Sequence, residues 1–237
     1  MEYCDEEISD ERRSFFFKMN FKLLCFAIDR IVQRSKPTKY RRKSEYFSQM
    51  QFITARHAML ESVSREIYQN NIIGNVAEAG VYRGEFAKYI NVMFPDRKLY
   101  LIDTFEGFDA RNVKTERKKG FSEGNEDFTQ TSIELVLNQM AYKKNCIVKK
   151  GFFPETMNNV EDSFCFVSLD MDLYEATLSG LNWFWPRMVN GGVIFVHDCR
   201  NQSYIGCRKA VEEFALVNHV GFIVLPDGEG SAVMMKT

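Results

Sequence analysis

The sequence predicts an α/β fold: a doubly wound, mostly parallel seven-stranded sheet with an antiparallel last strand, preceded by an N-terminal helical extension. From Asn75 onward, short apolar segments alternate with helical patterns, which is typical of a parallel sheet. The last two apolar segments are joined by "PDGEG", which is too short to connect parallel strands. A chain of 237 residues with 45% hydrophobic and 27% charged residues is ordinary for one globular domain of this class.

Residues 1–73 are predicted to form the helical extension, and residues 74–237 the α/β domain. The segment 14–34 is apolar but interrupted by Lys18, Asn20, Lys22 and Asp29, so it is not a membrane span. We expect a helix that packs on the domain or on a second subunit, with peripheral membrane attachment as the alternative. Residues 35–47 are polar and predict a loop. Apolar residues at helical spacing within 52–67 predict a second helix.

The α/β domain is predicted element by element. Strands are expected at 75–80, 98–103, 145–151, 163–170 and 191–198, helices at 84–94, 131–142, 177–188 and 206–217, and a hairpin at 221–236. Residues 104–130 are too long and too polar for a routine connection and are predicted to be a lid. A parallel sheet that ends in an antiparallel hairpin is the methyltransferase variant of the doubly wound fold, rather than the dinucleotide-binding one.

Composition excludes some partners. The formal net charge of -1 gives no long-range attraction to nucleic acid or to an anionic membrane, so a small-molecule partner is favoured. The acidic start "MEYCDEEISDERR" does not resemble a secretory signal. The six cysteines show no CxxC spacing and lie mostly in apolar segments, which predicts reduced thiols and a cytoplasmic protein.

A glycine-containing loop follows the first strand. In "EAGVYRG", Gly80 and Gly84 allow a turn and let a ligand approach the backbone at the start of the next helix. Turn geometry alone is the alternative. Asp103 ends the second strand about 20 residues later, where an acid can accept hydrogen bonds from both hydroxyls of a ribose; the alternative is a helix N-cap. Together the loop and Asp103 predict a cofactor that contains ribose.

Acidic residues also end two later strands. Asp170 and Asp198 should meet at the carboxyl edge of the sheet, where Mg²⁺ would offset their repulsion. Asp172 and His197 are possible further ligands or supporting groups, although Asp172 and Glu175 are also suitable helix caps. His197 is either a base at the site or a residue at the edge of the core. His57 and His219 are interpreted as structural.

Five motifs in order resemble the macrocin-type sugar O-methyltransferases, a family of class I S-adenosylmethionine-dependent enzymes: "VAEAGVYRGEFAKYI", "LYLIDTFEGF", "GFFPET", "FVSLDMDLYEATLSGL" and "GGVIFVHDC". The resemblance covers about residues 50–217. It implies that the chain uses S-adenosylmethionine and a bound Mg²⁺ to methylate a sugar hydroxyl. It implies that Glu78 and Gly80 hold the methionine end of the cofactor, that Asp103 holds the ribose, and that the "TFEGF" segment, with Thr104 and Phe105, and Gly151-Phe152 flank the adenine. Tyr82, Gly84 and Asp170 complete the expected cofactor-binding residues.

The same resemblance implies that Asp170 and Asp198 hold the metal. From its position beside them, His197 is expected as a further ligand, or as the base that takes the hydroxyl proton in place of a metal-bound water, with Asp170 as the other catalytic residue. Two departures stand out: the family often has two adjacent aspartates where this chain has His197 and Asp198, and residues 104–150 contain no histidine, where the family's proposed base lies.

The predicted function is therefore methylation of a hydroxyl on a sugar or a sugar-containing natural product by a homo-oligomeric enzyme. The alternatives are a catalytically silent binding subunit with this fold and a nicotinamide-dependent oxidoreductase. The basic segment 111–120 is interpreted as a solvated face, a cover for the cofactor or a contact for a phosphate on the acceptor.

Overall fold

The computed structural model describes residues 55–237, which belong to one compact unit. The predicted apolar helix at 14–34 and the loop at 35–47 lie outside the described residues. Helix α3 (Ala55–Gln69), which the sequence analysis assigned to the N-terminal extension, is part of this unit, because Leu60, Val63 and Ile67 on its inner face are buried.

The sheet has seven strands, as predicted, and their order is β3-β2-β1-β4-β5-β7-β6. Strands β1 to β5 are parallel, and β7 runs antiparallel to both β5 and β6. The hairpin of β6 and β7 therefore closes one side of the sheet. The bounds are β1 (Asn75–Ala79), β2 (Leu99–Asp103), β3 (Cys146–Lys150), β4 (Phe164–Leu169), β5 (Met188–Val196), β6 (Ile223–Val224) and β7 (Ala232–Met235).

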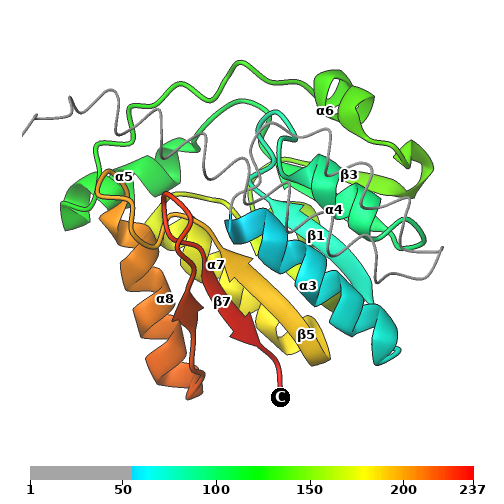
Figure 1. The fold of residues 1–237 in the computed structure, drawn as a ribbon. Coiled ribbons are helices and arrows are strands. Elements are labelled where there is room, and N and C mark those ends of the chain that lie inside the picture. The colour runs from blue at the N-terminus through cyan, green and yellow to red at the C-terminus, as the bar shows by residue number, and fades with distance from the viewer. Residues whose placement is uncertain (1–54) are drawn as a thin grey trace, which may run out of the picture. The chain divides into compact units, whose positions relative to one another are not determined.

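Helices cover both faces of the sheet (Figure 1). Helix α3 lies in front of the sheet in this view, whereas α7 lies behind it and packs beside α8. Phe164 of β4 and Phe184 of α7 are fully buried, and their rings meet edge-on in the core. The remaining helices are α4 (Ala87–Met93), α5 (Ala110–Lys119), α6 (Ile133–Gln139), α7 (Tyr174–Phe184) and α8 (Ile205–Asn218), with short 3-10 turns at Lys143–Asn145, Glu155–Met157 and Trp185–Arg187.

The segment predicted as a lid, 104–130, contains helix α5. Asp109 caps its start by accepting a hydrogen bond from the Arg111 backbone, and Gly120 ends it in the left-handed conformation. On its inner side, the buried Glu116 carboxylate accepts a hydrogen bond from the Tyr174 backbone at the start of α7. The lid segment is therefore attached to the main domain through this buried acid.

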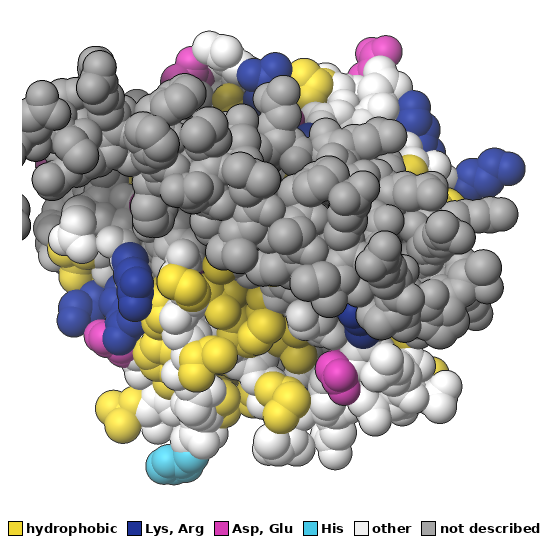
Figure 2. All heavy atoms as spheres, viewed as in Figure 1, with side chains coloured by type: hydrophobic (Ala, Val, Ile, Leu, Met, Phe, Trp, Pro, Cys, Tyr) yellow, Lys and Arg dark blue, Asp and Glu magenta, His cyan; other side chains and the backbone are white. Residues whose placement is uncertain are grey.

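Hydrophobic side chains gather on the face shown in Figure 2, over β5 and β7. Ile223 on β6 and Met235 on β7 are more than half exposed. Exposed apolar patches of this kind often mark interaction sites. The assembly of this chain into a homo-oligomer stays a prediction. Within residues 55–237, no helix is both long enough and apolar enough to cross a membrane. The cysteines in this range, Cys146, Cys165, Cys199 and Cys207, are free thiols.

Candidate active site

A cavity of about 680 Å³ opens at the carboxyl ends of β1, β2, β4 and β5. This is the edge at which open α/β sheets bind their ligands. Most of the site residues predicted from the sequence line it: Glu78, Gly80, Tyr82, Asp103, Thr104, Gly151, Phe152, Asp170, Asp172, His197 and Asp198. Gly84 and Phe105 do not. Gly84 packs against Val136 and Met140 of the α6 region, and Phe105 is buried.

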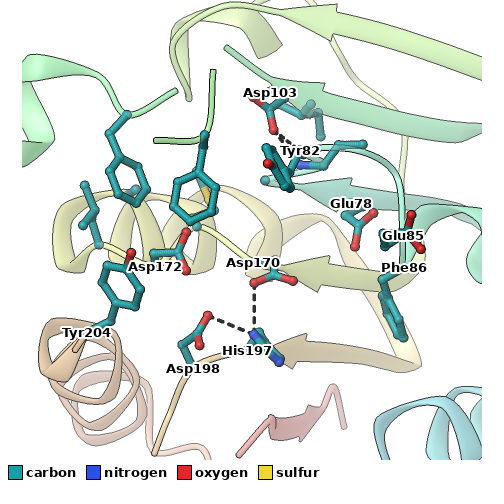
Figure 3. A pocket seen from close by; sticks show the side chains of 18 of the residues that line it. Glu78, Tyr82, Glu85, Phe86, Asp103, Asp170, Asp172, His197, Asp198 and Tyr204 are labelled. Carbon is teal, nitrogen blue, oxygen red and sulfur yellow. Dashed lines mark hydrogen bonds and ion pairs between the residues drawn. The ribbon is translucent and has the colours of Figure 1, made fainter. Parts of the chain in front are cut away.

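Asp170 and Asp198 converge, as their positions on adjacent strands predicted, and His197 lies between them (Figure 3). Its Nδ1 is 3.1 Å from an oxygen of Asp170 and 2.9 Å from an oxygen of Asp198. One ligand atom from each of these residues lies within 4.8 Å of the others, a spacing at which three side chains can share one cation. The backbone of His197 is fixed on both sides, since its N–H donates to Leu169 and its carbonyl accepts from the Cys207 thiol.

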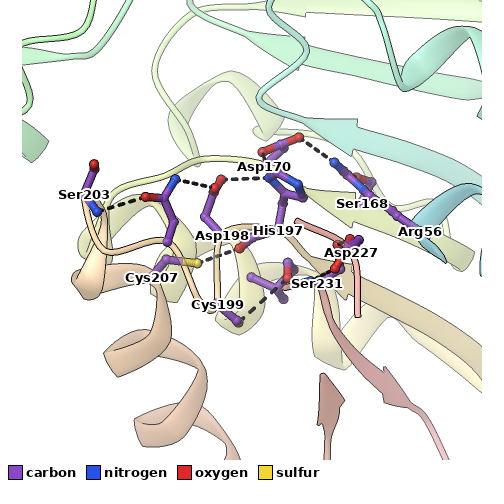
Figure 4. A network of polar contacts seen from close by, with 12 residues as sticks. Arg56, Ser168, Asp170, His197, Asp198, Cys199, Ser203, Cys207, Asp227 and Ser231 are labelled. Atoms are coloured by element: carbon purple, nitrogen blue, oxygen red, sulfur yellow. Dashed lines mark hydrogen bonds and ion pairs between the residues drawn. The ribbon is translucent and has the colours of Figure 1, made fainter. Parts of the chain in front are cut away.

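The second cation near these acids is Arg56, which the sequence analysis did not identify (Figure 4). Its Nη1 donates to Asp170 at 2.9 Å and its Nη2 to Ser168 at 2.8 Å, while Nη2 lies 3.9 Å from Glu78. The guanidinium also stacks on the Phe86 ring, 3.8 Å from its centre. Arg56 is only 6% exposed, so it acts on Asp170 in a poorly hydrated environment where charge interactions are strong.

These contacts set the protonation of the central pair. Burial alone would raise the pKa of Asp170, but the charges of Arg56 and His197 outweigh it and hold this pKa well below its usual range. Burial would likewise lower the pKa of His197, but Asp170 and Asp198 raise it to about 10. In the ligand-free protein, therefore, Asp170 is ionised and His197 carries a proton that bridges two carboxylates.

Asp172 does not cap the following helix. The N-cap of α7 is Leu173, no side chain caps this helix from that position, and the first backbone N–H of α7 donates to Glu116. Asp172 instead has a positive φ of 58°, and its carboxylate points into the cavity (Figure 3). A non-glycine residue pays free energy to adopt this conformation. The capping interpretation of Asp172 is thus wrong, and the side chain belongs to the cavity.

Asp103 holds the glycine loop in place. One of its oxygens accepts hydrogen bonds from the backbone N–H groups of Val81 and Tyr82, at 2.7 and 2.8 Å, and the other accepts from Phe105 at 2.7 Å. The Thr104 hydroxyl lies 3.4 Å from that second oxygen but donates its one proton to the nearer Gly107 carbonyl, at 2.6 Å. A carboxylate offers about four acceptor positions, so one remains for a hydroxyl of a ligand. This is room for one of the two ribose hydroxyls that Asp103 was predicted to bind.

Gly80 is required by the backbone around it. A Cβ atom at this position would lie 1.7 Å from the carbonyl oxygen of Asp170. Because residue 80 has no Cβ atom, the end of β1 and the end of β4 can approach closely, and Asp170 lies at the edge of the glycine loop. The space that glycine provides here therefore serves the packing of the site itself.

Glu78 is a buried acid with an unused hydrogen-bonding atom. It is 1% exposed, one of its carboxyl oxygens lies 3.4 Å from the Ser168 hydroxyl, and the other has no hydrogen-bond partner among residues 55–237. Burial raises its pKa to about 8, against the opposing effect of Arg56. An unsatisfied carboxyl oxygen in a cavity wall costs free energy in the empty protein, and a cationic ligand would remove that cost.

Two aromatic residues of the cavity, Phe128 and Tyr204, were not predicted. Together with Phe108, the last residue of the "TFEGF" segment that was expected beside the adenine, they line the cavity as an aromatic wall. The ring centres are 5.0 Å apart for the two phenylalanines and 6.1 Å apart for Phe108 and Tyr204. His57, interpreted from sequence as structural, also lines the cavity; its ring meets Phe86 and Tyr89 edge-on, and burial lowers its pKa to about 4. The other histidine, His219, caps the end of α8.

The basic segment 111–120 makes its contacts elsewhere. Arg111 pairs with Asp109 and Glu155 and stacks on Phe152, and Lys119 lies over Tyr174. No residue of this segment other than Asn112 lines the cavity. Arg111 thus reaches the predicted adenine side of the site only through the outer face of Phe152.

Comparison with known proteins identifies what this arrangement resembles. The family model described as macrocin-O-methyltransferase (TylF) matches residues 27–222. Among curated proteins, the demethyldecarbamoylnovobiocin O-methyltransferase of Streptomyces niveus is 24% identical over 63% of this chain and 61% of its own length. A tetracenomycin-C 4'-O-methyltransferase of Streptomyces olivaceus, which acts on a dimethoxy-rhamnosyl derivative, is 23% identical over 62% of this chain and 60% of its own length. This chain thus spans less than two thirds of either relative.

Solved structures share the fold. The O-methyltransferase NovP superposes with a TM-score of 0.62 at 20% identity, over 77% of this chain and 80% of its own. The calicheamicin methyltransferase CalS11 superposes with a TM-score of 0.63 at 16% identity, over 99% of both chains. At such identities the likeness concerns the fold.

Proposed function

The chain belongs to the macrocin O-methyltransferase family, and on this basis we propose that it transfers the methyl group of S-adenosylmethionine to a hydroxyl of a sugar or a sugar-containing natural product. The related proteins from Streptomyces are O-methyltransferases of a novobiocin derivative and of a rhamnosyl tetracenomycin derivative. A cytoplasmic, homo-oligomeric enzyme is part of the same proposal. The main support for S-adenosylmethionine as the cofactor is the excess of acidic over basic side chains among the described residues that line the cavity.

Among residues 55–237, nine acidic side chains line the cavity, against two arginines and two histidines. A dinucleotide would bring a negatively charged pyrophosphate to this acidic surface, which opposes binding. S-adenosylmethionine instead brings a sulfonium and an ammonium group, both positive. The cavity therefore favours a methyl donor over a nicotinamide cofactor. The acids are Glu78, Glu85, Asp103, Asp109, Asp170, Asp172, Asp198, Asp227 and Glu229.

The residues present fit this donor. The unsatisfied oxygen of Glu78 suits the ammonium of the methionine end, and Asp103 keeps an acceptor position for the ribose. At Gly151, with a φ of 136°, an added Cβ atom would meet only Thr156 on the protein side, which leaves the backbone beside Phe152 accessible to a flat ring. We assign the adenine to this position.

Binding of S-adenosylhomocysteine should release close to one proton from Glu78 near pH 7. In the empty protein the Glu78 pKa is about 8, so the group is protonated, and an ammonium group beside it favours the ionised form. Affinity should therefore rise by up to about tenfold per pH unit between roughly pH 6 and 7.5, below the ordinary pKa of the ligand's own amino group. Calorimetry in buffers of different ionisation enthalpy measures the release.

Glu78→Gln is the control for this prediction. It keeps the shape of the side chain but has no proton to lose, so its affinity should be lower and nearly independent of pH over the same interval. If the wild-type protein releases no proton on binding, Glu78 does not hold the ammonium group.

The site at Asp170, His197 and Asp198 fits a divalent cation, and we propose Mg²⁺ as that cation. Two carboxylates supply the hard oxygen ligands that Mg²⁺ prefers, although the imidazole nitrogen is better suited to softer metals. A cation bound there would hold the acceptor hydroxyl, lower its pKa and orient it toward the methyl group.

Binding of the divalent cation should release a proton from His197, because the Nδ1 that bridges the two carboxylates must lose its proton before its lone pair can bind the cation. His197→Asp supplies an oxygen in its place, so this variant should bind Mg²⁺ more tightly than wild type and without proton release. The measurement is calorimetry with MgCl₂ and MnCl₂. His219→Asp, at the far end of α8, is the matched control and should match wild type.

The chain's own residues would then act as follows. Asp170, kept ionised by Arg56, orients the acceptor hydroxyl. His197 would receive the hydroxyl proton where its Nδ1 has lost its own proton and is not a ligand of the cation; with Nδ1 on the cation, water would receive that proton instead. Asp198 is held by Asn201, whose side chain donates to it at 2.9 Å. Alignment of donor and acceptor is the main contribution expected of the site, since methyl transfer is an in-line displacement.

Mass spectrometry of the purified protein tests the proposal first. Retained S-adenosylmethionine or S-adenosylhomocysteine, and methylation of a sugar hydroxyl within a panel of glycosides, are expected. Cofactor binding with no methyl transfer to any acceptor would instead support the catalytically silent subunit, and binding of a nicotinamide cofactor would support the oxidoreductase.

A further inference from the structure

The hydroxyl of Tyr204 is buried and has no hydrogen-bond partner in the described part of the chain. Tyr204 is 5% exposed and lines the cavity, yet its oxygen makes no hydrogen bond with any residue in the range 55–237. Burial raises the pKa of Tyr204, and the exposed carboxylate of Glu126, the nearest acceptor to its hydroxyl, adds to this effect together with the charge of Asp172. Glu126 is close to hydrogen-bonding range, but no hydrogen bond with good distance and angle is formed. A buried hydroxyl without a partner costs free energy, so its presence in a cavity wall indicates a ligand that binds it.

The position of Tyr204 is fixed relative to the site. It closes the loop that begins at Asp198: the Tyr204 backbone donates to the Asn201 carbonyl, and the Asn201 side chain donates to Asp198 and accepts from the Ser203 backbone. The ring also meets Phe108 edge-on. A group that binds Tyr204 is therefore held at a set distance from the acids that hold the reacting hydroxyl.

Asp172 faces the same space. Figure 3 shows its carboxylate and the Tyr204 ring pointing into one part of the cavity, away from the glycine loop. The positive φ of Asp172 directs it there, at the end of β4 and two residues beyond Asp170. Phe108 and Phe128, both half-buried, border this space as part of the aromatic wall. A flat apolar face beside a donor and an acceptor suits the face of a sugar ring and its hydroxyls.

We propose that Asp172 and Tyr204 form a subsite of the acceptor, in which they bind a sugar hydroxyl that neighbours the methylated one while the ring rests on Phe108 and Phe128. The inference rests on the proposed function. Within the described part of the chain, the excess of acidic over basic side chains in the cavity favours a sugar without a phosphate near this subsite, a glycoside rather than a nucleotide-linked sugar.

Tyr204→Phe tests the subsite, because it removes only the unpartnered hydroxyl. Against the best glycoside from a panel of methyl glycosides, acceptor KM should rise about tenfold, while kcat, S-adenosylhomocysteine affinity and thermal stability stay close to wild type. For wild type, KM should also be about tenfold higher for the analogue that lacks the neighbouring hydroxyl. The variant should have nearly the same KM for the two acceptors. A merely structural tyrosine would not produce this loss of discrimination. Tyr142→Phe, at an exposed tyrosine, is the control.

Three results would overturn the subsite. The first is an unchanged KM in Tyr204→Phe. The second is a variant in which removal of the neighbouring hydroxyl from the acceptor raises KM as much as it does in wild type. The third is that saturation-transfer NMR detects no glycoside binding to protein saturated with S-adenosylhomocysteine. Tighter binding of a thymidine diphosphate sugar than of the matching methyl glycoside would overturn the phosphate-free assignment. In each case S-adenosylhomocysteine binding reports separately on the proposed function.

Discussion

Replacing Asp170 with asparagine should reduce methyl transfer by about 10²- to 10⁴-fold, the range that loss of a positioned acid or base produces, while S-adenosylhomocysteine affinity changes by only a small factor. The amide keeps the shape and can still accept from Arg56, but it removes the charge that orients the acceptor hydroxyl and shares the proton of His197. Glu78 and Asp103, which we assign to the cofactor, are left intact.

The measurement is turnover of the best glycoside by mass spectrometry, with calorimetry for the cofactor. Asp162→Asn is the matched control: this acid lies just before the other end of the same strand, where it accepts hydrogen bonds from Asn75 and Tyr100. Its loss should lower stability and leave kcat unchanged. Unchanged turnover in Asp170→Asn would remove Asp170 from both the proposed metal site and the proposed chemistry.

The meeting of Asp170 and Asp198 was predictable because it follows from strand order. Once β4 and β5 are recognised as neighbouring parallel strands, the residues that end them must share one edge of the sheet. The same reasoning placed Asp103 beside the glycine loop, and the short link before β7 predicted its antiparallel direction. These predictions depend on local patterns of apolar residues, which the sequence displays directly.

Other boundaries were not visible in such patterns. β5 begins at Met188 rather than Gly191, because "NGG" looks like a turn but continues the strand through an irregularity in its pairing with β4. Helix α5 has almost no apolar residues, and its only buried side chain, Glu116, is charged. A hydrophobic pattern cannot reveal a helix that is anchored by a buried acid.

Arg56 shows a further limit. In the sequence it is one charged residue within an amphipathic helix, and its partners Ser168 and Asp170 are 112 and 114 positions away. Only the packing of α3 across the sheet turns it inward. The unpartnered hydroxyl of Tyr204 is similar, since an unused hydrogen-bonding group can be recognised only after every neighbour is known. Thus the acids of the site were predictable, whereas the cation that stabilises them was not.

Arg56→Met should lower the free energy of unfolding by about 3–5 kcal/mol, the usual cost of leaving one member of a buried ion pair without its partner. Asp170 would lose its guanidinium, and Ser168 its donor, in a site with little access to water. Methionine keeps much of the apolar contact with Phe86, so the loss reports mainly on charge. Urea unfolding measures it.

Arg65→Met provides the comparison within the same helix. Arg65 pairs with Glu61 at i,i+4 on a partly exposed surface, where such pairs contribute about 0.3–0.5 kcal/mol. The double variant Arg56→Met/Asp170→Asn should recover part of the loss, because it removes the unpaired carboxylate along with the guanidinium. Equal effects of the two arginine substitutions, or a double variant no more stable than Arg56→Met, would contradict a coupling between Arg56 and Asp170. A measured coupling would mean that the protein supplies its own cation to Asp170, and that a bound metal ion acts on a carboxylate already stabilised from its buried side.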